Sequence, residues 1–249
     1  MLDTSTPSLA RAWDHLLGGG ASFAADRAMA LRLEALYPEI REALFSSRTY
    51  AADVVTRIAR SGVDQYLDIG SGLPTRPSTH ATARAILPAA RVAYVDRDPV
   101  VTEHGRALVP AGVRYVLGDL AEPEAILASG DLSGFIDFSR PACLVLTLVL
   151  HVLDPGTARA VVGVLVRALA PGSYLVVTAG AGESVALPES VWPGRFTTDD
   201  LASFFAGLDL VPPGIKEGGV ACGTGFKAPA SEGTGAAQVT GAAAGTGRP

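Results

Sequence analysis

Acidic and glycine residues gather where the first predicted strand gives way to a helix. Residues 67–72 read LDIGSG and bring Asp68, Gly70 and Gly72 together. Glycine lets the backbone turn sharply and approach a ligand, and open α/β sheets bind ligands at the carboxyl ends of their strands. The Asp68 carboxylate would repel a pyrophosphate here, because unit charges about 4 Å apart interact by roughly 4 kcal/mol at an effective dielectric of about 20. The turn therefore favours a ligand with positive charge, such as an ammonium or a sulfonium.

Two further acidic residues follow the next two predicted strands. Asp96, with Arg97 after it, ends the second, and Asp119 and Leu120 follow the third. A carboxylate at the end of the second strand can accept both hydroxyl hydrogens of a ribose. Asp119 could accept a hydrogen bond from an adenine amino group while Leu120 covers the ring. Each acid alone could instead be a helix cap or an exposed loop residue, but their order predicts a nucleoside site.

The elements that must position these residues alternate along the chain from residue 65. Alternating strands and helices predict a parallel sheet with helices on both faces. The fourth run is apolar almost throughout, so we expect it to be central. The predicted strands are residues 66–69, 92–95, 113–116, 143–150 and 174–177, with weaker candidates at 208–211 and 220–226. The predicted helices are residues 79–87, 100–108, 123–128 and 155–169, with a short one beginning at 197–200.

Three regions of different composition divide the chain. Residues 1–60 read as helices broken at glycines 18–20 and at Pro38, and they could form a lid or a fixed packing layer. Residues 61–227 contain the alternating elements of an α/β core. Residues 228–249 are rich in alanine, glycine and threonine and contain no aromatic residue, so we expect a disordered tail.

Composition excludes several classes of protein. The 249 residues are 48% hydrophobic and 18% charged, with a net charge of -5, which is typical of a globular chain and offers no electrostatic footprint for nucleic acid. The two cysteines, Cys143 and Cys222, form no CxxC or Cys/His cluster, so no metal site or disulfide is predicted. The longest apolar run, residues 142–150, is shorter than the roughly 20 residues of a membrane span. We see no signal peptide and expect a cytoplasmic protein without a membrane partner.

Several longer motifs extend this pattern. Residues 12–19 (AWDHLLGG), 67–75 (LDIGSGLPT), 94–101 (YVDRDPVV) and 137–141 (DFSRP) resemble a family of S-adenosyl methyltransferases common in actinobacteria. That family lies within the Rossmann-like class I S-adenosylmethionine-dependent methyltransferases. The resemblance implies a seven-stranded, mostly parallel sheet whose last strand is antiparallel, with S-adenosylmethionine over the carboxyl ends of the first strands. The cofactor residues would be Asp68, Gly70, Gly72, Asp96, Arg97, Asp119 and Leu120.

Methyl transfer is the activity that the resemblance implies, and we expect the acceptor to be a small molecule. The reaction depends mainly on proximity, alignment and exclusion of water, and a base is needed only if the acceptor must lose a proton. His151 follows the fourth predicted strand, so its imidazole could act as that base or orient the acceptor. A histidine that is only hydrogen-bonded within its loop is the alternative. Arg48 could pair with the cofactor carboxylate or with Asp26, and an ion pair on the helix surface is the alternative.

Two other functions stay open at this level. A nicotinamide-dependent oxidoreductase is disfavoured because Thr75 stands where the dinucleotide fingerprint needs a third glycine. A catalytically weak or inactive S-adenosylmethionine-binding regulator is the other alternative. It rests on departures from the family pattern at residues 47–48, 53, 78–81, 97 and 218–220.

Overall fold

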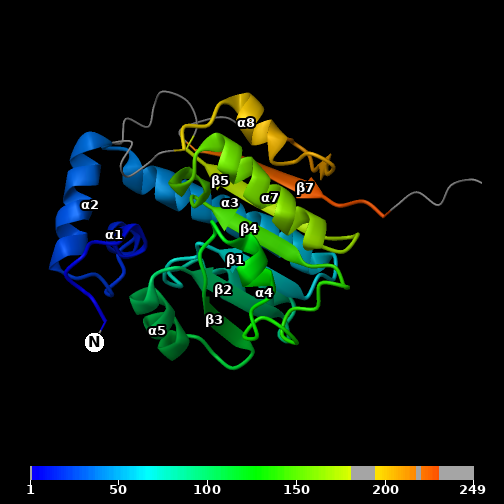
Figure 1. Ribbon diagram of the computed structural model, residues 1–249, viewed down its shortest axis with the longest axis horizontal. Coiled ribbons are helices and arrows are strands. Elements are labelled where there is room, and N and C mark those ends of the chain that lie inside the picture. The colour runs from blue at the N-terminus through cyan, green and yellow to red at the C-terminus, as the bar shows by residue number, and fades with distance from the viewer. Residues whose placement is uncertain (1, 181–193, 217–219, 230–249) are drawn as a thin grey trace, which may run out of the picture.

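One twisted sheet forms the centre of the protein, for which a computed structural model describes residues 2–180, 194–216 and 220–229. The strand order is β3-β2-β1-β4-β5-β7-β6 (Figure 1). The first five strands are parallel, β7 is antiparallel to β5, and β6 is antiparallel to β7. The strands are β1 (Gln65–Ile69), β2 (Arg91–Asp96), β3 (Val113–Leu117), β4 (Cys143–Thr147), β5 (Tyr174–Ala179), β6 (Asp209–Leu210) and β7 (Ala221–Phe226). This confirms the seven-stranded, mostly parallel α/β fold with an antiparallel last strand.

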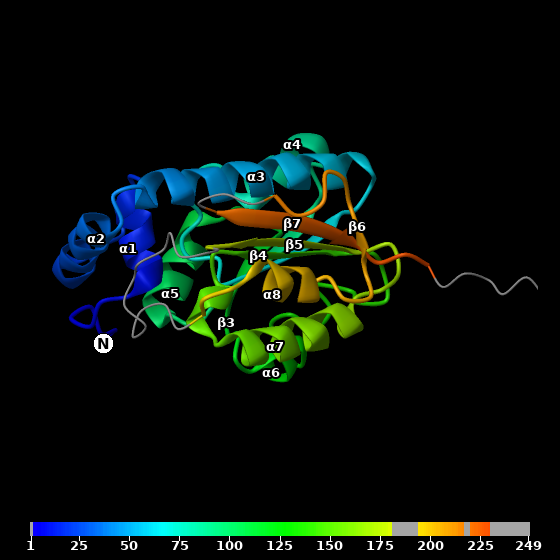
Figure 2. The same cartoon turned by 90° about the horizontal axis from the view of Figure 1, so that it is seen from above.

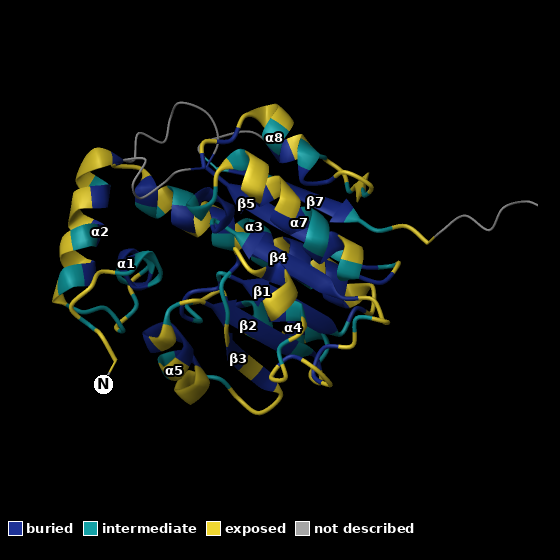
Figure 3. Ribbon diagram, in the orientation of Figure 1, coloured by how far each residue is buried: buried dark blue, intermediate teal, exposed yellow. Residues whose placement is uncertain are grey.

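Helices cover both faces of the sheet, as Figure 2 shows. Helices α3 (Ile40–Arg60) and α4 (Thr79–Ile86) lie on one face, whereas α6 (Pro123–Leu127), α7 (Pro155–Ala168) and α8 (Thr198–Ser203) lie on the other. Helix α5 (Pro99–Leu108) packs on β2 and β3. Strand residues alternate between these layers, so Tyr66 and Leu67 belong to different core clusters. Strands β1, β2, β4 and β5 are buried almost throughout (Figure 3), which explains their continuous apolar runs.

The first two helices stand at the end of the sheet where β1 to β4 terminate (Figure 1). Helices α1 (Leu9–Leu16) and α2 (Ala24–Leu36) pack together with the start of α3 in a separate apolar cluster. The breaks fall where the sequence predicts them, since Gly18 has a φ of 83° and α2 ends before Pro38. Helix α3 continues along β4 and β5, so it joins the N-terminal helices to the core.

Strand β4 is shorter than predicted. It ends at Thr147 rather than at residue 150, because Leu148 adopts a φ of 46° and cannot continue the strand. A short 3-10 helix, η1 (Leu150–Val152), follows and contains His151. Apolar residues alone could not reveal this turn, since they suit a buried strand and a buried loop equally.

No helix in the described part of the chain is long and apolar enough to cross a membrane. The predicted tail lies outside the described residues, except for its first two positions.

Candidate active site

A cavity of about 580 Å³ lies at the carboxyl ends of the parallel strands. Its floor is formed by the loops after β1, β2, β3 and β4, and its cover by the N-terminal segment and helices α1 to α3. A cavity of this size fits a cofactor-sized ligand. The order of the sheet reverses between β1 and β4, which is where open α/β sheets bind ligands.

The glycine turn after β1 forms the centre of this floor. Gly70 and Gly72 have φ values of 66° and 57°, which side chains other than glycine rarely adopt. A Cβ at Gly70 would come within 2.0 Å of Val149 Cγ2, so the turn also needs glycine for space. The backbone N–H of Gly70 donates to the Val95 carbonyl at 2.8 Å, which fastens the turn to β2.

Asp96 lies at the end of β2 and lines the cavity, as predicted. Its Oδ2 accepts a hydrogen bond from the Gly72 N–H and its Oδ1 one from the Asp98 N–H, both at 2.9 Å. A carboxylate can accept about four hydrogen bonds, so each oxygen can still accept a ligand hydroxyl. Burial raises the pKa of Asp96 to about 6, and these two hydrogen bonds offset the effect only in part.

Asp119 and Leu120 line the cavity beyond β3. Leu120 is buried, whereas the Asp119 side chain is 39% exposed and its Oδ1 accepts from the Ala121 N–H. Arg97 also lines the cavity, but its side chain is 64% exposed and approaches Asp119 only at 3.9 Å. The structure thus places both residues together at the open edge.

Asp68 lies beside the main cavity and does not line it. It faces a small polar cavity that shares Arg48 and Thr147 with the larger one. Asp68 Oδ2 accepts from Thr79 Oγ1 at 2.6 Å, while its buried Oδ1 has no hydrogen-bond partner in the described part of the chain. Burial raises the pKa of Asp68 to about 6, against the lowering effects of Thr79 and Arg48. An unsatisfied buried carboxylate oxygen fits a site that receives a cation or a bridging water.

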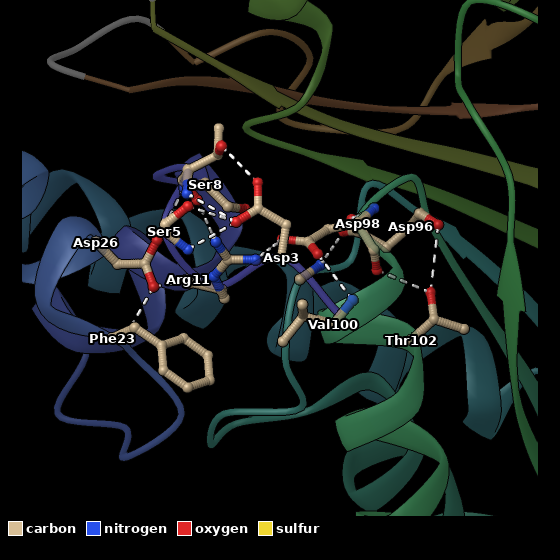
Figure 4. Close-up of polar contacts among 12 residues, drawn as sticks. Asp3, Ser5, Ser8, Arg11, Phe23, Asp26, Asp96, Asp98, Val100 and Thr102 are labelled. Carbon is tan, nitrogen blue, oxygen red and sulfur yellow. Dashed lines mark hydrogen bonds and ion pairs between the residues drawn. The ribbon is translucent and has the colours of Figure 1, made fainter. Parts of the chain in front are cut away.

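A buried ion-pair network that the sequence did not reveal joins α1 to this site (Figure 4). Arg11 is 2% exposed, and its Nε donates to Asp26 at 2.9 Å while its Nη1 donates to Asp98 at 2.7 Å. Burial raises the pKa of Asp26, but hydrogen bonds from Arg11 and two backbone N–H groups leave that pKa below its usual value. Asp98 in turn caps α5 through the Val100 N–H. Arg11, and not Arg48, is therefore the partner of Asp26.

His151 lines the cavity from η1 and is almost fully buried. Burial lowers the pKa of its imidazole to about 3, so the ring is neutral at physiological pH. Its backbone carbonyl accepts from the Gly194 N–H at 2.8 Å. The predicted acceptor-side histidine thus lies within the cavity, on a 3-10 turn and not directly at a strand end.

Helices α1 to α3 supply much of the apolar lining of the cavity. Leu9, Trp13 and Leu17 recur at helical spacing in the sequence, a pattern that cannot distinguish core packing from a ligand cavity. The structure shows that these side chains are only half-buried and line the cavity.

Asp96, Asp119 and the half-buried apolar side chains of the N-terminal helices thus line one cavity. Comparison with known proteins assigns the chain to a family. The model of the S-adenosyl methyltransferase family matches residues 1–220. The chain belongs to this family. It is an S-adenosylmethionine-dependent methyltransferase, so the oxidoreductase alternative is set aside. No functionally curated protein is significantly similar to the chain.

Solved structures agree with this assignment. A protein from Thermobifida fusca YX, described as a candidate methyltransferase, is 35% identical with a TM-score of 0.84 over 91% of this chain and 97% of that one. A DUF574 family protein from Streptomyces avermitilis MA-4680 is 28% identical with a TM-score of 0.83, over 91% and 100%. The N-methyltransferase NodS from Bradyrhizobium japonicum WM9, solved with S-adenosylhomocysteine, is 15% identical over 87% and 96%. Its TM-score of 0.52 shows a similar fold.

Proposed function

We propose that this methyltransferase acts on a small molecule enclosed between the strand ends and helices α1 to α3. The observation that carries the proposal is the position of the cavity, which is covered by Leu9, Trp13 and Met29 directly opposite the strand-end loops. Enclosure excludes water and aligns the reacting groups, which is most of what methyl transfer requires. The acidic net charge and the covered site favour a small acceptor over nucleic acid. The two cysteines form no disulfide framework, which favours action in the cytoplasm.

The adenosine part of the cofactor would lie across the ends of β2 and β3. Asp96 would accept the ribose hydroxyl hydrogens, since both its oxygens retain acceptor capacity. Asp119 would accept from the adenine amino group, and Leu120 would cover the ring. Arg97, at the exposed edge, would contact the nucleoside from outside.

The amino-acid part of the cofactor would lie over Gly70 and Gly72, near Arg48. Arg48 Nη2 lies 3.4 Å from the Ser71 carbonyl, a weak contact that leaves most of the guanidinium donors available to a carboxylate. Asp68 would hold the ammonium through one bridging water, because the small cavity at Asp68 is about 10 Å³, close to the space of one water. This arrangement separates the two charges of the amino acid between Arg48 and Asp68.

The cofactor supplies an activated methyl group, so the protein has to position the acceptor and manage its proton. We propose that His151 does this as the catalytic residue. Its neutral imidazole can accept a hydrogen bond from the acceptor, which orients the nucleophilic atom without adding charge to the apolar end of the cavity.

Titration calorimetry with S-adenosylhomocysteine tests these roles. The Asp96→Ala protein should bind at least about tenfold more weakly than the wild type, because both ribose hydroxyls lose their acceptor. Asp131→Ala serves as the control, since the Asp131 side chain is 68% exposed and lies outside the cavity. Equal affinity of Asp96→Ala and wild type would overturn the proposed site.

A further inference from the structure

Large apolar side chains surround the end of the cavity next to β4. Leu9, Trp13, Leu17, Met29 and Leu148 line it and are only half-buried, although they pack on the buried cluster that contains Leu44. Apolar side chains that protein atoms leave partly uncovered inside a cavity are suited to bind an apolar ligand. Tryptophan and methionine in particular offer favourable contacts to an aromatic ring.

The charged groups of the cavity are already committed elsewhere. Asp96 and Asp119 belong to the nucleoside end, and Arg48 to the amino-acid end. Arg11 is shared between Asp26 and Asp98, at 2.9 and 2.7 Å. Asp3, in the N-terminal segment, is held by the side chains of Ser5 and Thr6. Each carboxylate among the described residues that line the cavity therefore already accepts a hydrogen bond from the protein, whereas the apolar end is lined by Leu9, Trp13, Leu17, Met29 and Leu148.

Leu148 is held in a strained conformation at this apolar end. It is the one non-glycine residue in the described ranges with a positive φ, at 46°. Its backbone N–H donates to both the carbonyl and Oγ1 of Thr178, at 2.9 and 3.1 Å, and Thr178 is in turn linked to Ser47 at 2.6 Å. Strained backbone held by its surroundings is typical of ligand sites. The strain here presents the Leu148 side chain to the apolar cluster of α1 and α2.

We propose that the methyl acceptor is an uncharged aromatic molecule with a hydroxyl group, bound among Trp13, Met29 and Leu148. The inference rests on the proposed function and narrows it to oxygen methylation of an apolar ring compound. The acceptor oxygen forms the new O–CH₃ bond as the S–CH₃ bond breaks, and the bonding electron pair stays on sulfur to give S-adenosylhomocysteine. The hydroxyl proton leaves the acceptor oxygen as the O–CH₃ bond forms and is released to the solvent outside the cavity.

Three naphthalene derivatives with similar rings but different charges test the acceptor class: neutral 2-naphthol, anionic 2-naphthoate and cationic 2-(aminomethyl)naphthalene. Calorimetry on the full-length protein saturated with S-adenosylhomocysteine should show that 2-naphthol binds at least about tenfold more tightly than 2-naphthoate or 2-(aminomethyl)naphthalene, since transferring a charge into an apolar site is costly. With S-adenosylmethionine, mass spectrometry should detect O-methylated 2-naphthol. Equal or tighter binding of either charged derivative, or no binding of 2-naphthol, would overturn the inference.

A matched pair of substitutions on α2 locates the binding. Met29→Glu places a carboxylate in the apolar end, so it should weaken 2-naphthol binding about tenfold and strengthen binding of the amine. Leu31→Glu makes the same change on the exposed face of the helix, where Leu31 is 61% exposed, and should change neither. Unchanged naphthol affinity in a folded Met29→Glu protein would contradict the placement.

Two further titrations separate the proposed cofactor site from the proposed acceptor class: S-adenosylhomocysteine alone, and the three naphthalene derivatives without it. If S-adenosylhomocysteine does not bind but 2-naphthol is still preferred, the cofactor site is refuted and the apolar site is supported. Normal S-adenosylhomocysteine binding with no preference for 2-naphthol would refute the acceptor class alone.

Discussion

The carboxylate of Asp96 and the backbone N–H of Gly72 are joined by a 2.9 Å hydrogen bond. This bond connects the end of β2 to the glycine turn after β1. The Gly72 carbonyl accepts from the Tyr115 hydroxyl at 2.9 Å, so β3 also contributes to the turn. The part of the site assigned to the ribose and the part assigned to the methionine chain are thus held in one arrangement by a residue that serves both.

Cofactor affinity should depend on the protonation of Asp96 and Asp68. Burial raises the pKa of each to about 6, and the proposed contacts need both groups ionised. Below pH 6 these groups must release protons before binding, so affinity for S-adenosylhomocysteine should fall, up to about tenfold per pH unit for each group. Titration calorimetry from about pH 5 to about pH 8 brackets these pKa values and measures the affinity. Repeating it in two buffers of different ionisation enthalpy measures the proton release. Constant affinity across that range would contradict the assignment.

Asp68 should reduce stability while serving binding. Its folded pKa exceeds the ordinary value of 3.8, so the ionised form costs stability above pH 6, and the cost disappears as the pH falls toward 3.8. We therefore expect Asp68→Asn to raise the free energy of unfolding by about 1–3 kcal/mol at neutral pH, with the gain vanishing in acid. The same variant should bind S-adenosylhomocysteine more weakly. Thermal unfolding with and without that ligand measures both effects, and exposed Asp131→Asn should show neither.

Removal of Arg11 should destabilise the whole cover. Arg11→Leu leaves Asp26, which is fully buried, and Asp98 without their cation, and breaking a buried pair in this way costs about 3–5 kcal/mol. Arg140→Leu is the matched control, since Arg140 pairs with Asp64 at 3.0 Å on the surface and should cost less than about 1 kcal/mol. Urea unfolding compares the two. A similar small loss in both variants would show that the network contributes little.

Gly70 should not tolerate a side chain. Alanine there would combine a positive φ with a 2.0 Å contact to Val149, and we expect a loss of about 2–5 kcal/mol together with loss of cofactor binding. Gly20 has open space at its Cβ position, so Gly20→Ala should change stability by no more than about 0.5 kcal/mol. Equal stability of the two variants would mean that the turn can rearrange.

His151 should affect methyl transfer more than cofactor binding. With 2-naphthol as acceptor, His151→Phe should lower kcat by about a hundredfold, because the hydroxyl loses its hydrogen-bond partner, and leave S-adenosylhomocysteine affinity within about twofold. His151→Gln retains a hydrogen-bond acceptor and should recover part of the rate. Single-turnover kinetics give the rate of the chemical step, and an unchanged rate in His151→Phe would assign the residue a structural role.

Local patterns revealed the sheet and the nucleoside end of the site. The β-prone runs alternate with helices. Asp96 ends β2 and Asp119 lies two residues after β3, so their meeting at one edge follows from parallel topology. The end of β4 could not be found in this way, because the turn at Leu148 depends on hydrogen bonds to Thr178, a residue of the neighbouring strand. The ion pair between Arg11 and Asp98 could not be predicted from local patterns either, since the two residues lie 87 positions apart along the chain.

The orientation of the Asp68 side chain could not be predicted from the sequence. Its type and spacing pointed to the cofactor, but alternation along β1 directs it toward α3 and α4, next to the main cavity. A sequence shows which residues end a strand, whereas the orientation of each side chain depends on register and on the helices packed above it.

A crystal structure of the complex with S-adenosylhomocysteine tests the central claim most directly. We expect the ribose hydroxyls within hydrogen-bond distance of Asp96, the adenine between Asp119 and Leu120, and the amino-acid carboxylate on Arg48, with the sulfur facing the apolar end at Leu148. A nucleoside bound outside this cavity, or with its ribose directed away from Asp96, would contradict the account.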